Sequence, residues 1–121
     1  MPAQVVIVHE DDVFRSRAVG AVAGQGYSVT AFHDALDAML ALEDARALEV
    51  LVTSLHFAEG RSNGIALASM AKTRKRDSRA IFIVESQVDA ALVSDEVVLF
   101  APVSLSDLVT AIRDCLGSSR S

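Results

Sequence analysis

The sequence is poor in cysteine, in long apolar runs and in positive charge, and each of these scarcities argues against a class of protein. Its 121 residues contain one cysteine, Cys115, which excludes an internal disulfide and a zinc site built from cysteines. No apolar run is long enough to cross a membrane, and the first residues lack the basic and apolar regions of a signal peptide. We therefore expect a cytoplasmic protein in which Cys115 is a packed residue of a helix.

Positive charge is also scarce, because the formal net charge is -5. This balance argues against a general nucleic-acid binder. The positive charges gather in the segment KTRKRDSR, which contains Lys72, Arg74, Lys75, Arg76 and Arg79. Cations at the end of a helix complement the negative end of its dipole, and the same cations form a candidate docking patch for an acidic partner.

The sequence does contain a regular alternation of strand and helix patterns. Short stretches rich in Val, Ile, Leu and Phe predict strands at 4–9, 28–32, 50–54, 80–85 and 97–100, and helical patterns cover 12–25, 35–46, the residues after Gly64, and 105–116. This alternation predicts one α/β domain over 1–121, with a core at about 4–116, a polar tail at 117–121, and a parallel sheet covered on both faces.

Polar residues follow the first predicted strand directly. His9, Glu10 and Asp11 come after the buried run VVIV. In sheets of this kind ligands bind at the carboxyl ends of the strands, beside the point where the strand order reverses. These three residues are therefore the first candidates for a functional site.

The alternation, the acids after the first strand, the turn GQGYSVTAF, the Asn63-Gly64 pair and the Pro102 that follows the fifth strand together resemble the response-regulator receiver domain of the CheY-like family. The resemblance implies a flavodoxin-like, doubly wound sheet of five parallel strands in the order 2-1-3-4-5. It also implies a cis peptide bond between Ala101 and Pro102.

The resemblance also implies where a phosphorylation pocket would lie. The family's two metal-binding acids fall on His9 and Glu10, with Asp11 next in line, and its phosphoacceptor aspartate falls on Ser54. Its hydroxyl residue falls on Glu85, its lysine on Ala101 and its aromatic switch residue on Val98. Serine cannot form an acyl phosphate, and the positive charge that would stabilise a phosphoryl group is lost. We therefore interpret the pocket as degenerate.

The fourth helix is expected to be short or missing, because the interval from Glu85 to Ala101 is shorter than the family commonly uses. Only the segment QVDAALVSDE is available, enough for about two turns. In the family the fourth helix, fifth strand and fifth helix form the usual output and dimer face. We therefore expect an altered partner surface that contains Val98, Pro102 and Val103. The sequence leaves open whether this surface forms a homodimer.

Our leading hypothesis is an atypical receiver in two-component or phosphorelay signalling that is not an enzyme and needs no cofactor. It would bind a histidine kinase, a regulator or an output protein independently of phosphorylation, and would bind neither nucleic acid nor a membrane. Because the sequence ends shortly after its last helix, we expect output to be supplied in trans or by a domain outside this sequence.

Three alternatives stay open. The first is a sensor of a small ligand or a divalent metal, with Glu10 and Asp11 as weak metal candidates. The second is a receiver that is still phosphorylated, on Ser54 or Asp11. The third is a hydrolase using Ser54, His9 and Glu85, although the sequence has no G-x-S-x-G motif and no glycine beside Ser54 for an oxyanion hole.

Overall fold

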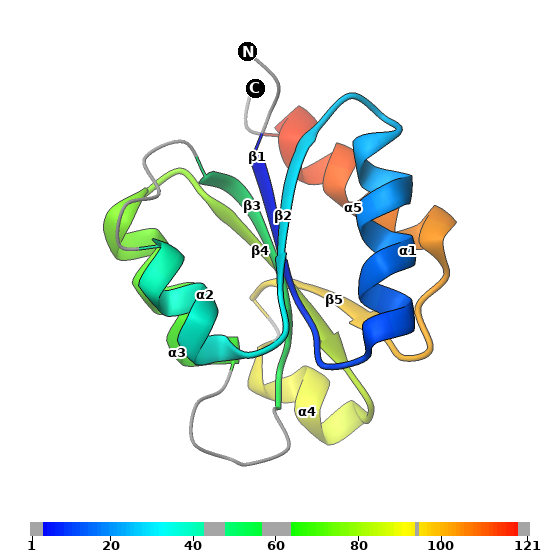
Figure 1. The fold of residues 1–121 in the computed structure, drawn as a ribbon. Coiled ribbons are helices and arrows are strands. Elements are labelled where there is room, and N and C mark those ends of the chain that lie inside the picture. The colour runs from blue at the N-terminus through cyan, green and yellow to red at the C-terminus, as the bar shows by residue number, and fades with distance from the viewer. Residues whose placement is uncertain (1–3, 43–47, 57–63, 94, 119–121) are drawn as a thin grey trace.

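The computed structural model describes residues 4–42, 48–56, 64–93 and 95–118. Five strands form one parallel sheet: β1 (Gln4–Val8), β2 (Ser28–Phe32), β3 (Leu48–Ser54), β4 (Arg79–Val84) and β5 (Val97–Phe100). Their order is β2-β1-β3-β4-β5, as predicted (Figure 1). The order reverses between β1 and β3, so the carboxyl ends of these two strands frame the place where such sheets bind ligands.

Helices cover both faces of the sheet. The helices α1 (Asp12–Ala23) and α5 (Leu105–Ser118) lie on one face, and α2 (Ala35–Leu42) and α3 (Gly64–Arg74) lie on the other (Figure 1). One buried apolar cluster forms on each face, and the central strands β1, β3 and β4 contribute to both clusters. Burial on both faces is the reason that these strands read as nearly continuous apolar runs.

The helix ends differ from the sequence expectations in two places. The helix α1 ends at Ala23, before the predicted end at Gln25, and Gly26, with a φ of 92°, supplies the left-handed turn before β2. The helix α5 continues through Gly117 to Ser118, so Gly117 does not end it as expected. A glycine costs only about 1 kcal/mol within a helix, so the preceding turns can carry the helix past it. Residues 43–46, predicted as helical, lie outside the described residues.

The fourth helix is short, as predicted. The helix α4 (Gln87–Leu92) has six residues, none of them buried, and lies near the carboxyl ends of the strands (Figure 1). It begins at Ser86, whose Oγ accepts a hydrogen bond from the backbone N–H of Asp89 at 3.1 Å. The apolar side chains of Val88 and Leu92 remain exposed.

The end of β3 and the start of α3 approach each other closely at Gly64. The backbone N–H of Gly64 donates to the carbonyl of Leu55 at 2.8 Å, and a Cβ on Gly64 would lie 2.2 Å from the carbonyl oxygen of Ser54. Only glycine leaves room for this contact. The peptide bond between Ala101 and Pro102 is cis, as the resemblance implied. Among the described residues, no helix is long and apolar enough to span a membrane.

Candidate functional site at the carboxyl ends of the strands

A cavity of about 280 Å³ opens at the carboxyl ends of the strands. His9 and Glu10 reach it from the end of β1, Ser54 from the end of β3, Glu85 from the end of β4 and Ala101 from the end of β5. The structure therefore brings together five of the six residues that the sequence assigned to the degenerate pocket. The sixth, Asp11, does not line the cavity.

Asp11 instead begins the helix α1. Its Oδ1 accepts hydrogen bonds from the backbone N–H groups of Val13 at 2.9 Å and Phe14 at 3.1 Å. These bonds, the one from Phe14 above all, lower the pKa of the Asp11 carboxyl. The acid at this position is a helix cap, which is a sufficient structural reason for its presence.

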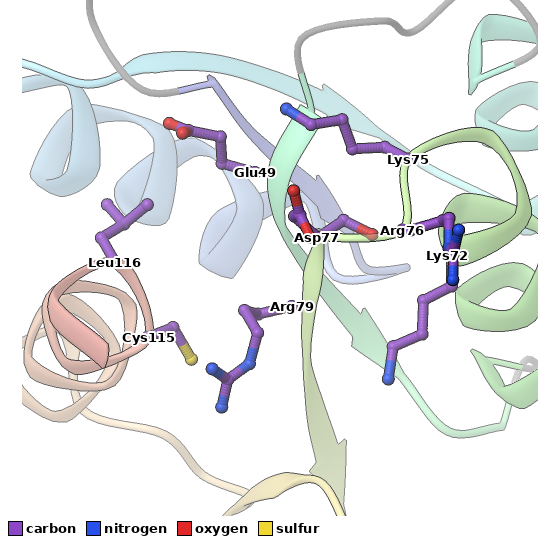
Figure 2. Close-up of a pocket in the computed structure, with 9 residues that line it drawn as sticks. Glu49, Lys72, Lys75, Arg76, Asp77, Arg79, Cys115 and Leu116 are labelled. Atoms are coloured by element: carbon purple, nitrogen blue, oxygen red, sulfur yellow. The ribbon is translucent and has the colours of Figure 1, made fainter. Parts of the chain in front are cut away.

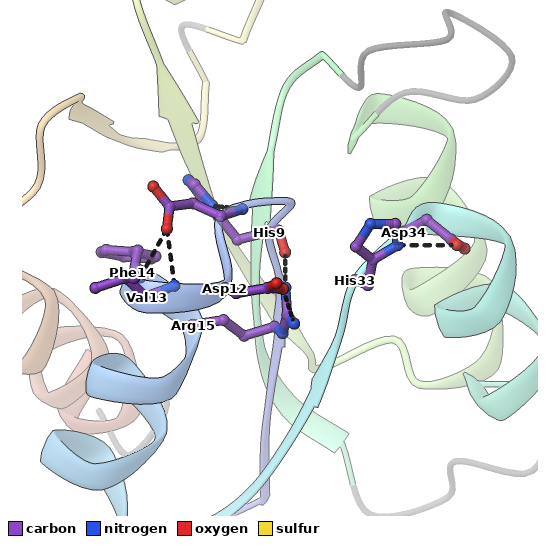
Figure 3. Close-up of polar contacts among 8 residues, drawn as sticks. His9, Asp12, Val13, Phe14, Arg15, His33 and Asp34 are labelled. Carbon is purple, nitrogen blue, oxygen red and sulfur yellow. Dashed lines mark hydrogen bonds and ion pairs between the residues drawn. The ribbon is translucent and has the colours of Figure 1, made fainter.

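His9 is partly buried, and its ring contacts the backbone of Asp11 and the ring of Phe14. Its Nδ1 accepts a hydrogen bond from the backbone N–H of Asp11 at 3.1 Å, and its ring lies 4.5 Å from the ring of Phe14 (Figure 3). Burial lowers the pKa of His9 and outweighs the opposing effect of the neighbouring carboxylates of Asp11 and Glu10. Because a neutral ring that accepts at Nδ1 carries its proton on Nε2, His9 is a hydrogen-bond donor at its other nitrogen.

The cavity has a negative lining. Three acids, Glu10, Glu85 and Asp89, line it, and no lysine or arginine does so among the residues that the structure describes. Arg15, which follows this site in the sequence, donates to the backbone carbonyl of His9 at 2.8 Å and pairs with Asp12 (Figure 3). Arg61 lies outside the described residues.

Sequence reasoning missed the pair of His56 and Asp89. The Nε2 atom of His56 lies 3.0 Å from Oδ1 of Asp89, and both residues line the cavity. His56 follows β3 and Asp89 belongs to α4, so the contact depends on the placement of a helix whose very existence was in doubt from the sequence. His33, by contrast, lies at the end of β2 and contacts Asp34 at 3.4 Å (Figure 3).

The weak metal candidates are separated by the fold. Glu10 lines the cavity, whereas the Asp11 carboxylate is bound to the first turn of α1. Among the described residues, no group of three or more His, Cys, Asp or Glu side chains is arranged to hold a metal ion.

The predicted partner-surface residues divide between the two faces of the sheet. Val98 packs against the cluster beneath α2 and α3, and Val103 packs against the cluster beneath α1 and α5, whereas Pro102 is exposed. None of the three lines the cavity. The basic residues lie elsewhere, near the amino-terminal ends of β3 and β4, where four of the five line a second cavity.

Solved receiver structures superpose on nearly the whole chain. A response regulator receiver protein from Sinorhizobium medicae WSM419 matches with a TM-score of 0.87 and 19% identity, covering 98% of this chain and 97% of that chain. A CheY-like receiver domain protein from Methanospirillum hungatei JF-1 matches with a TM-score of 0.87 and 15% identity, covering 99% and 98%. A signal receiver domain of an HD domain-containing protein from Pseudomonas fluorescens Pf-5 matches with a TM-score of 0.81 and 17% identity, covering 99% and 98%.

Neither a protein-family model nor a curated protein matches the sequence. At these identities the structural matches establish the fold, which is the CheY-like receiver fold, and leave the chemistry of the site to be argued from its own residues.

Proposed function

We propose that this chain is an atypical receiver protein in two-component or phosphorelay signalling, and that it acts by binding another protein without being phosphorylated on aspartate. The observation that carries this proposal is the lining of the cavity at the carboxyl ends of the strands. Ser54 ends β3, Glu85 follows β4 and Ala101 follows β5, at the positions where the receiver resemblance expects an aspartate, a hydroxyl residue and a lysine.

The chemistry of this lining opposes phosphoryl transfer to a carboxylate. A phosphoryl group carries several negative charges, and sites that transfer it stabilise it with metal ions and cationic side chains. Here the strand-end acceptor is a hydroxyl, and the described lining contributes the acids Glu10, Glu85 and Asp89 without a lysine or arginine. An anionic donor would therefore meet repulsion at the place where it must react.

The tautomer of His9 argues against the hydrolase alternative. A general base must offer an unprotonated nitrogen to the attacking hydroxyl. In neutral His9 the unprotonated Nδ1 accepts from the backbone of Asp11, so the other nitrogen, Nε2, carries a proton. Ser54, His9 and Glu85 share one cavity, but His9 is not set up to remove a proton from Ser54.

The partner in this proposal is a signalling protein, such as a histidine kinase, a regulator or an output protein. Exposed apolar side chains on α4 and β5 give it a surface to bind: Val88 is 75% exposed, Leu92 59% and Phe100 45%. Single exposed apolar residues are ordinary, but these three lie on two short elements that follow one another in the chain, and a partner that covers them would bury apolar surface.

Amide spectra of the labelled protein test the proposal. We would add magnesium, and then beryllofluoride or acetyl phosphate, and measure intact mass in parallel. The expected result is no shift at His9, Ser54, Glu85 or Ala101 and no added phosphate, while a receiver with the usual aspartate and lysine responds in the same buffer. Saturable shifts that spread from the cavity to β5, or a phosphate on Ser54 or Asp11, would overturn the proposal.

A further inference from the structure

A second and larger cavity lies at the other end of the strands from the first, near the amino-terminal ends of β3 and β4. Its volume is about 550 Å³. Three parts of the chain build it: the start of β3, the turn from α3 into β4, and the last turns of α5 (Figure 2). Ligand-binding clefts commonly have volumes of about 300–1,000 Å³, so this cavity is large enough for a small molecule.

Four cations line this cavity. Lys72 comes from the last turn of α3, Lys75 and Arg76 from the turn that follows, and Arg79 from the first position of β4. The ammonium group of Lys72 pairs with Glu96. Lys75 and Arg76 make no ion pair with another described residue, so their charges are available to a ligand. The concentration of cations in a chain of net charge -5 makes this the place where an anion would bind.

The rest of the lining is not cationic. Glu49 and Asp77 contribute two carboxylates, and α5 contributes an apolar wall from Leu116 beside the buried thiol of Cys115 (Figure 2). Figure 2 also shows the Arg79 side chain extending toward α5, so a cation and the apolar wall face the same space. A ligand that fits must combine a negative group, hydrogen-bond donors for the carboxylates and an apolar part.

We propose that this cavity binds a small phosphorylated molecule of nucleotide size. Its phosphate groups would bind Lys75 and Arg76, its hydroxyl or amino groups would donate to Glu49 or Asp77, and its ring would pack on Leu116. An acidic protein segment fits less well, because its further carboxylates would meet Glu49 and Asp77. The proposal goes beyond the signalling role argued above, since it concerns a different cavity, at the amino-terminal ends of the strands.

The test uses the whole protein with ADP as the probe, followed by amide spectra. The expected result is saturable shifts confined to Glu49 and to residues 72–79 and 115–116. Arg76→Ala should weaken ADP binding by about tenfold, because a charge-assisted hydrogen bond to phosphate is lost. Arg74→Ala is the matched control: it removes one positive charge from an exposed residue on the same helix end that does not line the cavity, and it should change binding by no more than about twofold.

Adenosine, pyrophosphate and a hexaglutamate peptide complete the experiment. Weak or absent shifts with adenosine, and shifts with pyrophosphate at Lys75 and Arg76, would support the proposal. Silence with both ADP and pyrophosphate would overturn it, as would equal sensitivity to Arg74→Ala and Arg76→Ala, which indicates unspecific attraction. Stronger shifts with hexaglutamate than with ADP would also overturn it and assign the cavity to an acidic partner. Beryllofluoride reports on the other cavity, so the two proposals fail separately.

Discussion

His56 and Asp89, which both line the cavity at the carboxyl ends of the strands, contact each other, with Nε2 of His56 3.0 Å from Oδ1 of Asp89. The pair joins the end of β3 to α4, a helix in which no residue is buried. A helix with so little buried surface depends on polar contacts and on its cap to hold its place. The pair therefore contributes to fixing the surface that carries Val88 and Leu92.

Asp89→Asn should loosen α4 without unfolding the protein. Asparagine keeps the backbone N–H that donates to Ser86 but removes the charge that faces His56. A partly exposed polar contact of this kind contributes about 0–1 kcal/mol, so the global free energy of unfolding should change little, while amide hydrogen exchange in 87–93 should become faster. His56→Asn should have a similar effect, and the double variant should add little to either one. Additive effects would show that the two residues do not act as a pair.

Gly64→Ala should destabilise the protein strongly. The new Cβ would lie 2.2 Å from the carbonyl oxygen of Ser54 and 3.1 Å from a methyl group of Thr53, so the start of α3 must move away from β3. Overpacking of this kind costs typically 1–3 kcal/mol, and we expect a loss of about 2 kcal/mol or more in denaturant unfolding.

Gly20→Ala is the matched control for this variant. Gly20 lies within α1, and nothing lies within 4 Å of the position that its Cβ would take. Alanine should therefore stabilise the helix by about 0.5–1 kcal/mol. If both substitutions had the same small effect, the close approach at Gly64 would not be a constraint on the fold.

The sequence was sufficient to predict the fold because the period of its apolar residues changes with each element. The runs in β1, β3 and β4 are buried on both faces, which is characteristic of parallel strands, and the strand order followed from the receiver resemblance. The helix ends were harder to predict from the sequence. Gly117 carries the signal that normally ends a helix, yet α5 continues through it, because the terminal residue of a helix depends on packing as well as on propensity.

The lining of the cavity was predictable where residues end a strand or follow it at once. His9, Glu10, Ser54, Glu85 and Ala101 fit this description, and all of them line the cavity. Asp89 also lines it but belongs to α4, and its position depends on how a six-residue helix packs, which no local pattern records. The second cavity shows the same limit: its cations stand out in the sequence, but its far wall comes from Cys115 and Leu116, which only the folded chain brings beside them.

His9 should make the protein less stable in mild acid. Burial lowers its pKa in the folded state below the ordinary value of 6.5. In the unfolded state His9 takes up a proton as the pH falls through about 6.5, so that state binds more protons and the free energy of unfolding decreases. The contribution of neutral, buried His9 to the free energy of unfolding is complete above this pH. Below it the contribution declines, by at most about 1.4 kcal/mol per pH unit for one proton.

Denaturant unfolding at pH 7.5 and 5.5 measures this effect in the wild type and in His9→Asn. Asparagine retains a side-chain acceptor for the backbone N–H of Asp11 but does not titrate. The loss of stability between the two pH values should therefore be smaller in His9→Asn. The lowered pKa of Asp11 belongs to a more acidic range, and His33 and His56 are present in both proteins, so none of them contributes to the difference. An equal loss in both proteins would assign the acid sensitivity to another group.

The last prediction tests the proposal that the cavity at the carboxyl ends of the strands is a degenerate phosphorylation pocket. Ser54→Asp alone should not produce a response to beryllofluoride in the presence of magnesium. Beryllofluoride is an anion, the cavity already carries the acids Glu10, Glu85 and Asp89, and Ala101 supplies no cation to offset them. Adding Glu85→Thr and Ala101→Lys removes one acid and supplies a cation, so the triple variant should show saturable amide shifts around positions 54, 85 and 101. The control is the triple variant in which Ala101→Met replaces Ala101→Lys. Methionine has about the length of lysine without its charge, so this variant should show no amide shifts. A response from Ser54→Asp alone would show that an aspartate at position 54 is enough for this pocket to respond. No response from a folded triple variant would contradict the proposal that positions 54, 85 and 101 limit the response, and would direct the next substitution to His9.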